Sequence, residues 1–422
     1  MFTTWKIRNN TLLLLWLVFF VAYIDRTNFT VAAPYIQKEL QLSPAELGIA
    51  MSAFLIGYGW LQVIGGIMAD RWGGRKTMVF AILWWSVFTA LTGVAWGFMS
   101  LVVIRFVFGV GESFQPPASW KAVSVWFPKK ERLRANALML GAIALAPAVT
   151  PLIVVWCMQA FGWKGVFYFF AIPGIIMAWF VWKNLYDDPA EHPKITKEEL
   201  SEIYDGLPPA SQASKMSLWD ACKVPGLLLL SMIYLIFDIT FWGFLSWLPS
   251  YLVTVRKFAM LKMGIYASLP FLSGFIGLML ADTISNKIFH RNKIVFLSTI
   301  LAIGSASMFF AYAADNAEVC IAFLSLTAFS AIFMFFGPFW GLVTETLPSQ
   351  AMGFLSSIIN GAGKIGGSVA PAAIGALIQW TGGSYAAGFS LMEGCLLVCA
   401  ILVFFMREKK PLLRAVKGAS MI

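Results

Sequence analysis

The chain has 422 residues, of which 59% are hydrophobic and only 12% are charged, and its mean hydropathy is +0.76. A soluble domain is roughly half apolar and a quarter charged, so this composition excludes a soluble protein and indicates a polytopic membrane protein. The 31 Lys and Arg residues outnumber the 21 Asp and Glu residues, but they gather in short stretches between apolar runs. That distribution is typical of cytoplasmic loops and argues against nucleic-acid binding.

Apolar runs recur along the whole chain, and twelve of them are long enough for a membrane-spanning helix, which needs about 20 residues. The expected spans are 11–36, 46–69, 77–96, 98–125, 134–158, 163–184, 225–252, 262–284, 293–313, 318–344, 352–379 and 384–406. The sequence therefore predicts an all-α membrane protein with twelve transmembrane helices in two pseudo-symmetric bundles of six. Residues 1–190 form the expected N-terminal bundle, 191–222 a cytoplasmic linker and 223–422 the C-terminal bundle. Within the linker, Thr196-Lys197-Glu198-Glu199 predicts a short surface helix with a capping-box start.

Basic residues predict how the spans are oriented. Five groups fall on one side of the membrane if the spans alternate: Lys6/Arg8, Arg71/Arg75/Lys76, Lys129/Lys130/Arg132/Arg134, Lys287/Arg291/Lys293 and Arg407/Lys409/Lys410. Cytoplasmic loops are rich in Lys and Arg, so we expect both termini in the cytoplasm and the chain in a bacterial inner membrane. The loop with Arg256, Lys257 and Lys262 departs from this rule.

The first span contains an acid and a base side by side, Asp25 and Arg26. The fourth span adds Arg105 and Glu112, which are seven residues apart and so share a helix face. Each charge at a bilayer centre costs about 2.5–3.5 kcal/mol, so such residues normally face a protein interior or a water-filled cavity on a substrate or proton path. The alternative is a pair that only holds two helices together. Which acid pairs with which base stays open.

These four residues offer a chemical basis for proton-coupled transport. A cation beside a buried carboxylate opposes its protonation, and an anion bound to that cation removes the opposition. Proton binding and anion binding then favour each other. We therefore expect Asp25 and Glu112 to carry protons, and Arg26 and Arg105 to meet an organic anion such as a carboxylate.

A basic, glycine-containing loop joins spans two and three, with the sequence Gly66-Ile-Met-Ala-Asp70-Arg71-Trp-Gly73-Gly-Arg75-Lys76. Gly66 is expected to let helices approach closely, Gly73 to permit a tight turn, and Asp70 to meet a helix N-terminus or the loop arginines. The second half of the chain contains a weaker repeat of this motif: Gly277, Asp282, Lys287, Arg291 and Lys293. A plain basic loop that fixes orientation is the alternative. The full spacing resembles the loop motif of the major facilitator superfamily, which implies a gating role for Gly66, Asp70, Arg71, Gly73 and Arg75.

Further motifs narrow the resemblance to the anion:cation symporter family, which includes bacterial sugar-acid transporters and vesicular glutamate and sialic-acid transporters. These motifs are Tyr23-Ile-Asp25-Arg26-Thr-Asn28, Arg105…Gly-Glu112…Pro116, Trp126-Phe127-Pro128, Trp247-Leu-Pro249-Ser-Tyr251-Leu252 and Asn360…Gly363…Gly366-Gly367. The resemblance implies that Asp25 and Glu112 are the proton-coupling pair and that Arg26 and Arg105 act in anion binding. It also implies a substrate pocket lined by Tyr58, Trp340 and Asn360, and Tyr23 is a further candidate for the cavity wall.

The sequence departs from the sugar-acid pattern in ways that bear on the substrate. Ala142, Gly337 and Phe339 stand near positions where sugar-acid carriers have polar or hydroxylated residues. Their absence disfavours a polyol chain and favours a less hydroxylated, larger or aromatic carboxylate. Two more charges lie in the second half, Asp238 in span seven and Lys364 in span eleven. They either pair with each other to stabilise this half, or Lys364 enters the cavity as a second anion-binding base, with Asp238 as an additional cavity charge.

Several functions remain to be separated. The first interpretation is a proton-driven importer of an organic anion that works by alternating access. A proton-antiporting exporter of an organic anion or polycarboxylate siderophore would use the same residues. A non-transporting receptor would need a soluble signalling domain, and a membrane-embedded enzyme would need a metal or nucleophile cluster; the sequence shows neither. No Walker loop or Gly-rich dinucleotide motif appears, so we expect no cofactor and a proton gradient as the driving force. We expect a monomer in the lipid bilayer, with the identity of the anion and the proton stoichiometry left open.

Overall fold

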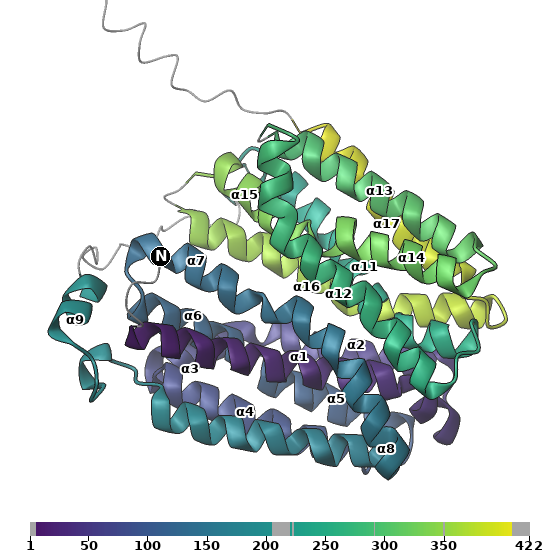
Figure 1. Ribbon diagram of the computed structural model, residues 1–422, viewed down its shortest axis with the longest axis horizontal. Helices are drawn as coiled ribbons and strands as arrows, with labels where there is room; N and C mark the ends of the chain where they lie inside the picture. The colour runs from purple at the N-terminus through teal and green to yellow at the C-terminus, as the bar shows by residue number, and fades with distance from the viewer. Residues whose placement is uncertain (1–5, 205–219, 222, 291, 349–350, 407–422) are drawn as a thin grey trace, which may run out of the picture.

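The computed structural model describes residues 6–204, 220–221, 223–290, 292–348 and 351–406, and every regular element in these ranges is helical (Figure 1). The N-terminal elements are α1 (Ile7–Glu39), α2 (Pro44–Trp60), α3 (Gln62–Trp72), α4 (Gly74–Thr92), α5 (Phe98–Glu112), α6 (Gln115–Trp126), α7 (Lys129–Leu140), α8 (Ala142–Asn184), η1 (Pro189–Glu191) and α9 (Lys197–Tyr204). The C-terminal elements are α11 (Leu227–Thr254), α12 (Met260–Lys287), α13 (Lys293–Ala313), α14 (Ala317–Thr327), η2 (Ala328–Phe333), α15 (Phe336–Thr346), α16 (Met352–Trp380) and α17 (Ala386–Phe404).

The helices are long and apolar enough for a multi-pass membrane protein. Nine helical segments of the described chain could cross a membrane, or ten if α2 and α3, which meet at 44°, form one span. Each of the twelve expected ranges lies largely on helix, but α4 is not among the candidates and residues 129–184 count as one segment. Inside that segment Gly162 has φ 66° and ψ 178°, a kink that glycine adopts without steric cost. The membrane-spanning all-α class is confirmed, and the number twelve stays a prediction.

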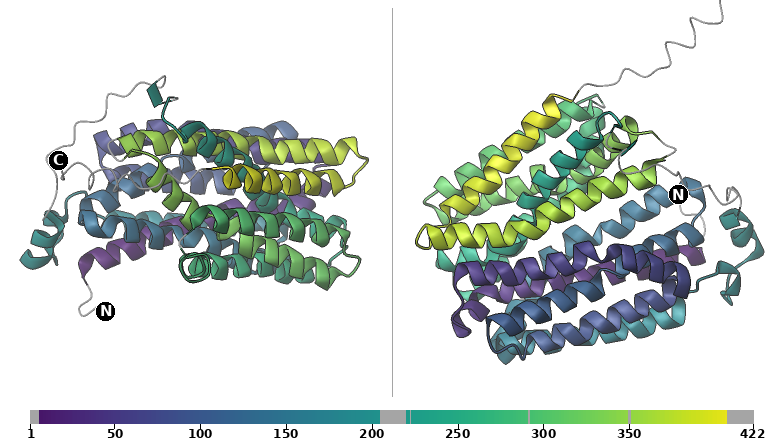
Figure 2. Two further views of the ribbon diagram at one scale, coloured as in Figure 1. Left: turned by 90° about the horizontal axis from the view of Figure 1, so that it is seen from above. Right: turned by 180° about the vertical axis from the view of Figure 1, so that it is seen from behind.

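The two halves of the chain form two groups of helices that run side by side. Figure 1 shows α1–α8 in purple to teal on one side and α11–α17 in green to yellow on the other, and the view from behind in Figure 2 shows the same division. Of the expected linker, residues 205–219 and 222 lie outside the described part. The exact domain boundaries therefore stay a prediction, as does the placement of Arg291, Arg407, Lys409 and Lys410, which also lie outside it.

The halves meet most tightly along α2 and α16. A side chain on Gly48 would come within 2.4 Å of the Pro371 carbonyl oxygen, and one on Gly375 within 2.4 Å of the Pro44 carbonyl oxygen. One turn further along α2, the Ser52 hydroxyl accepts a hydrogen bond from the backbone N–H of residue 372 at 3.0 Å. A second close approach joins α8 and α12, where a side chain on Gly264 would come within 2.7 Å of Val155 Cγ2. Gly264 lies in the first turns of α12. The halves are therefore closed against each other at the end where α2 begins and α16 ends.

The linker helix α9 packs against the start of α1. The Glu199 carboxylate accepts hydrogen bonds from the backbone N–H groups of Ile7, at 3.1 Å, and Arg8, at 2.9 Å, which have no partner within α1. Arg8 also pairs with Glu131 of α7, at 3.1 Å, and Glu202 of α9, at 3.0 Å. The predicted short helix is confirmed, and the Thr196 hydroxyl accepts from the Glu199 N–H at 3.2 Å as the capping sequence implies.

Arg256, the base that departs from the charge rule, closes a helix end. Its guanidinium donates to the Tyr251 hydroxyl at 2.8 Å and to the carbonyl oxygens of Ala311 at 3.1 Å and Asp315 at 3.3 Å. The last carbonyls of a helix lack partners inside it and carry partial negative charge. Arg256 therefore satisfies the C-terminal end of α13, which gives this base a structural reason for its place.

Four expected spans are interrupted, and in span five the break lies at Gly141, between α7 and α8. The α2–α3 break lies at Leu61, and η2 is a turn of π-helix inside span ten. In span four the helix stops at Ser113 and restarts at Gln115, followed by Pro116 and Pro117. Proline fits the first turn of a helix because its missing N–H is not needed there. Breaks and π-turns of this kind are frequent near functional sites, and the break in span four directly follows Glu112.

Candidate functional site

Arg26 and Glu112 form a buried ion pair between α1 and the end of α5. Arg26 Nε donates to Glu112 Oε2 at 2.5 Å, and the two side chains are 2% and 0% exposed. This contact answers which acid in the N-terminal half pairs with which base. The pair is nevertheless incomplete, because Arg26 Nη1, Arg26 Nη2 and Glu112 Oε1 have no hydrogen-bond partner in the described part of the chain.

Asp25 and Arg105 are buried but do not form a second ion pair. Asp25 Oδ1 accepts from Asn28 Nδ2 at 3.2 Å, while Asp25 Oδ2 has no partner among the described residues. Arg105 is 3% exposed, and within those residues no carboxylate lies within 4.0 Å of it. Its guanidinium lies over the Phe29 ring, 4.2 Å from the centroid, and the Phe108 ring, at 4.8 Å. Aromatic faces attract the cation but leave its N–H groups unsatisfied.

The four charged residues therefore hold free hydrogen-bonding capacity of both kinds in one buried cluster. A buried polar atom without a partner costs about 1–3 kcal/mol, and native proteins keep few of them. The free Nη1 and Nη2 atoms of Arg26 match the two oxygens of a carboxylate. The free oxygens of Asp25 and Glu112 are places where a proton can be held. The cluster has the chemistry to bind an anion and a proton together.

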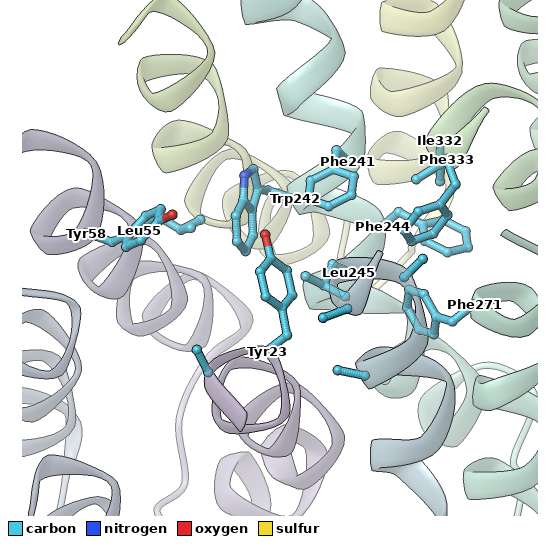
Figure 3. Close-up of a cluster of buried hydrophobic side chains, with 14 of the residues drawn as sticks. Tyr23, Leu55, Tyr58, Phe241, Trp242, Phe244, Leu245, Phe271, Ile332 and Phe333 are labelled. Atoms are coloured by element: carbon cyan, nitrogen blue, oxygen red, sulfur yellow. The ribbon is translucent and has the colours of Figure 1, made fainter. Parts of the chain in front are cut away.

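Aromatic rings of α1 and α2, both in the N-terminal half, flank the Arg26 guanidinium. Its Cζ atom lies 4.4 Å from the centroid of the Tyr23 ring and 4.3 Å from that of the Tyr58 ring. Tyr58 also faces Lys364 of α16, whose Nζ is 5.9 Å from the same ring centroid. Figure 3 shows Tyr23 reaching from its helix toward Trp242 of α11, with Tyr58 on the neighbouring side. The predicted pocket residues Tyr23 and Tyr58 thus lie where the halves meet.

Asp238 and Lys364 pair with each other across α11 and α16. The distance from Lys364 Nζ to Asp238 Oδ2 is 3.6 Å, and the side chains are 17% and 2% exposed. The stem of Lys364 also touches the other half, because a side chain on Gly59 would come within 3.0 Å of Lys364 Cβ. The pair within the C-terminal half is therefore present, and the Lys364 stem also contacts α2, while anion binding by Lys364 stays a prediction.

The C-terminal side of the site is largely aromatic. Trp340 lies 5.4 Å from Tyr234 between ring centroids, and Phe339 stacks on Tyr234 at 5.2 Å. Asn360 is half-buried one turn before Lys364 on α16. Tyr234 was not among the residues predicted from the sequence. A signal was present, because Tyr234 precedes Asp238 by four residues and so shares its helix face.

The loop residues lie apart from this cluster. Asp70 pairs with Lys121 of α6 at 3.2 Å, rather than with a helix N-terminus or the loop arginines as expected. The backbone N–H of Arg75 donates to Asp187 at 2.9 Å, and Arg71 is exposed. Gly73 has φ 87°, so the predicted tight turn is confirmed.

The expected close approach at Gly66 is wrong. Nothing lies within 4 Å of a side chain placed on Gly66, whereas one on Gly65 would come within 2.8 Å of Phe114 Cα. The error is one position along a helix, which turns the residue by about 100° away from its neighbour. Gly277 has the matching place in the second half, since its added side chain would lie 2.3 Å from the Phe329 carbonyl oxygen. Gly65 precedes Asp70 by five residues, as Gly277 precedes Asp282.

Comparisons with known proteins agree with this architecture. The family model of the Major Facilitator Superfamily matches residues 15–371. The probable sulfoacetate transporter of Cupriavidus necator is 31% identical over 95% of this chain and 94% of its own. The probable galactarate/D-glucarate transporter of Escherichia coli K12 is 29% identical over 87% of each chain, and a D-galactonate transporter of Escherichia coli O6:H1 is 28% identical over 89% of this chain and 90% of its own.

A solved structure shares the fold. A bacterial homologue of the human lysosomal transporter Spinster, in an inward-facing and unoccupied conformation, superposes with a TM-score of 0.76, covering 95% of this chain and 97% of its own at 19% identity. The match to the family model and the similarity to full-length relatives place the chain among membrane transporters rather than enzymes. The chain belongs to the major facilitator superfamily.

Proposed function

We propose that this protein imports an organic anion together with protons across a bacterial inner membrane, as a monomer that works by alternating access. One observation carries the proposal: the Arg26–Glu112 pair is fully buried and yet leaves two guanidinium nitrogens and one carboxylate oxygen without partners. The free nitrogens suit an anion and the free oxygen suits a proton. The relatives named above are transporters of sugar acids and of sulfoacetate, which are organic anions.

The coupling follows from competition for Arg26. Glu112 is the counter-ion of Arg26, with Arg26 Nε 2.5 Å from Glu112 Oε2. An anion at the free face of Arg26 shares its positive charge, so the Glu112 carboxylate is less well compensated and binds a proton more readily. By linkage, protonation of Glu112 strengthens anion binding by the same factor. Asp25 and Arg105 form a second acid and base in the same cluster.

The closed end identifies which state of the transport cycle the structure represents. With both termini in the cytoplasm, the contact of Gly48 and Gly375 with the facing backbone lies on the periplasmic side. The conformation described is then closed to the periplasm. Uptake requires α2 and α16 to separate there and the opposite ends to close, which rocks one half against the other around the site.

The test is uptake into proteoliposomes that hold the purified protein. The probes are radiolabelled galactarate, galactonate and sulfoacetate, chosen after a thermal-shift screen for binding. We expect accumulation when the outside is made acidic and loss of accumulation with an uncoupler. Equal accumulation with and without the uncoupler would overturn proton coupling. Proton-driven efflux in place of uptake would overturn the direction, and a lack of binding to any organic acid would overturn the whole proposal.

A further inference from the structure

We propose that Lys364 and Asp238 form a second anion subsite, so that the transported anion carries two negatively charged groups and Asp238 takes up a proton when the second group displaces it from Lys364. The inference rests on the proposed function, because it concerns the same transported anion. It begins from a loose pair: Lys364 Nζ lies 3.6 Å from Asp238 Oδ2, beyond hydrogen-bond distance, whereas Arg26 and Glu112 are 2.5 Å apart.

The loose pair leaves both partners with unused capacity. Asp238 Oδ2 has no hydrogen bond within the described residues, although the side chain is only 2% exposed. An ammonium group has three donors, and Asp238 lies within ion-pair distance of the Lys364 ammonium without a hydrogen bond to it. The Lys364 side chain is 17% exposed, so its head is more open than that of Asp238. An anion that reaches Lys364 can therefore compete with Asp238 for it.

Lys364 and Arg26 come from opposite halves and face the same ring. Arg26 Cζ lies 4.3 Å and Lys364 Nζ 5.9 Å from the centroid of Tyr58, so the two cations are at most about 10 Å apart. An anion with one charged group contacts one of them. An anion with charged groups at both ends of a short body contacts both, and binding then draws the two halves together.

The surroundings indicate the body that joins the two charged groups. Lys364 Nζ lies 6.0 Å from the Trp242 ring centroid, and Tyr23 and Tyr58 contribute the other rings near the site (Figure 3). Aromatic faces contact apolar groups well and offer few partners for a chain of hydroxyls. The substrate class that fits best is a dicarboxylate or sulfocarboxylate with a short, weakly hydroxylated body.

Charge balance explains the role of Asp238. A dianion that takes over Lys364 leaves Asp238 buried near Tyr234, since a side chain placed on Gly363 would touch both of them. A neutral phenol cannot compensate the charge of the carboxylate. A buried charge without a partner is strongly destabilising, and a proton on the Asp238 carboxylate removes that cost. Each negative group of the substrate is thereby matched by one proton, at Asp238 in one half and at the Glu112 cluster in the other.

Matched pairs of anions test the subsite. Binding to the purified full-length protein is measured by calorimetry for sulfoacetate against acetate, galactarate against galactonate, and terephthalate against p-toluate. We expect the parent to prefer the dianion of at least one pair, and Lys364→Ala to weaken that dianion by at least about tenfold, or 1.4 kcal/mol, with its matched monoanion unchanged. Lys293→Ala is the control, since Lys293 pairs with Glu345 at the loop end of α13 and should change neither.

Measuring proton uptake on dianion binding tests whether Asp238 accepts a proton. This measurement does not depend on Lys364→Ala, so it still tests the proposal if that variant does not fold. Asp238→Asn should bind the dianion at least as tightly as the parent but take up one proton fewer per dianion, measured in weakly buffered solution. An unchanged proton count, or an equal loss of dianion and monoanion affinity in Lys364→Ala, overturns the inference. If the parent transports monoanions with protons and shows no preference for dianions, the subsite is wrong and the proposed function stands. If no anion binds, the proposed function itself fails.

Discussion

Glu112 accepts a hydrogen bond from Arg26 through Oε2 alone, at 2.5 Å, and its other carboxylate oxygen has no partner among the described residues. The base is left equally incomplete, with Nη1 and Nη2 free. A pair that served only to hold α1 against α5 would gain from further hydrogen bonds on both sides, because unsatisfied buried atoms are costly. The hydrogen-bonding atoms without partners on Arg26 and Glu112 indicate that this pair also binds a ligand and a proton.

Arg26→Lys should weaken anion binding although it keeps the positive charge. Lysine has no planar fork, so it cannot present two parallel N–H donors to a carboxylate. Calorimetry with sulfoacetate should show a loss of about tenfold or more in affinity. Tyr266→Phe is a suitable control, because Tyr266 packs with Phe258 away from the cluster. If Arg26→Lys bound the anion as tightly as the parent, the two Nη atoms of Arg26 would not be the anion-binding site.

The contact of α2 with α16 should act as the gate at the closed end. Gly375→Ala places a methyl group 2.4 Å from the Pro44 carbonyl oxygen, which forces the helices apart, whereas Gly361→Ala on the same helix meets nothing within 4 Å. Ser52→Cys is added to each variant, and the rate at which a thiol reagent labels this cysteine is measured. Labelling should be faster with Gly375→Ala than with Gly361→Ala. Equal labelling rates in the two variants would show that this contact does not govern access.

Neighbouring glycines on α3 should differ sharply. Gly65→Ala brings a methyl group within 2.8 Å of Phe114 Cα and should destabilise the protein by about 1–3 kcal/mol through overpacking. Gly66→Ala faces open space and should be neutral or slightly stabilising, because alanine favours a helix by up to about 1 kcal/mol. Thermal unfolding of both variants in detergent gives the comparison. A larger loss at Gly66 would contradict the helix register described.

The packing of α9 against the start of α1 should become less stable as the pH falls. The Lys6 ammonium, followed by the Arg8 guanidinium, holds the pKa of Glu202 below its usual value. A carboxylate with a lowered pKa in the folded state contributes stability above its unfolded pKa, about 4.3, and loses that contribution as the pH falls through the folded value. Glu202→Gln should therefore lower the melting temperature at pH 7 and have little effect near pH 3.

Glu198→Gln is the matched control for Glu202→Gln, since Glu198 is exposed on the same helix. It should leave the melting temperature unchanged at both pH values. A Glu202→Gln effect that is the same at pH 7 and at pH 3 would show that the charge on Glu202 does not hold α9 in place.

The sequence was sufficient for the fold class and for most of the charged site, because charges and apolar runs leave a clear signal. Asp25, Arg26, Arg105 and Glu112 stand out against lipid-soluble neighbours, and the structure gathers them in one buried region. The pairing of Arg26 with Glu112 could not be predicted, since it depends on how α1 packs against α5. The close approach at Gly65 was missed for the same reason: a one-residue shift in helix register changes the face, and only the packing shows which face is covered.

The most direct test of the account counts protons when the anion binds. Purified protein in weakly buffered solution is mixed with saturating sulfoacetate, and the pH change is recorded for the parent and for Glu112→Gln. We predict that the parent takes up protons, that its anion affinity rises as the pH falls, and that Glu112→Gln still binds the anion but takes up one proton fewer. Equal proton uptake by the variant and the parent would contradict the assignment of Glu112 as the residue that couples protons to the anion.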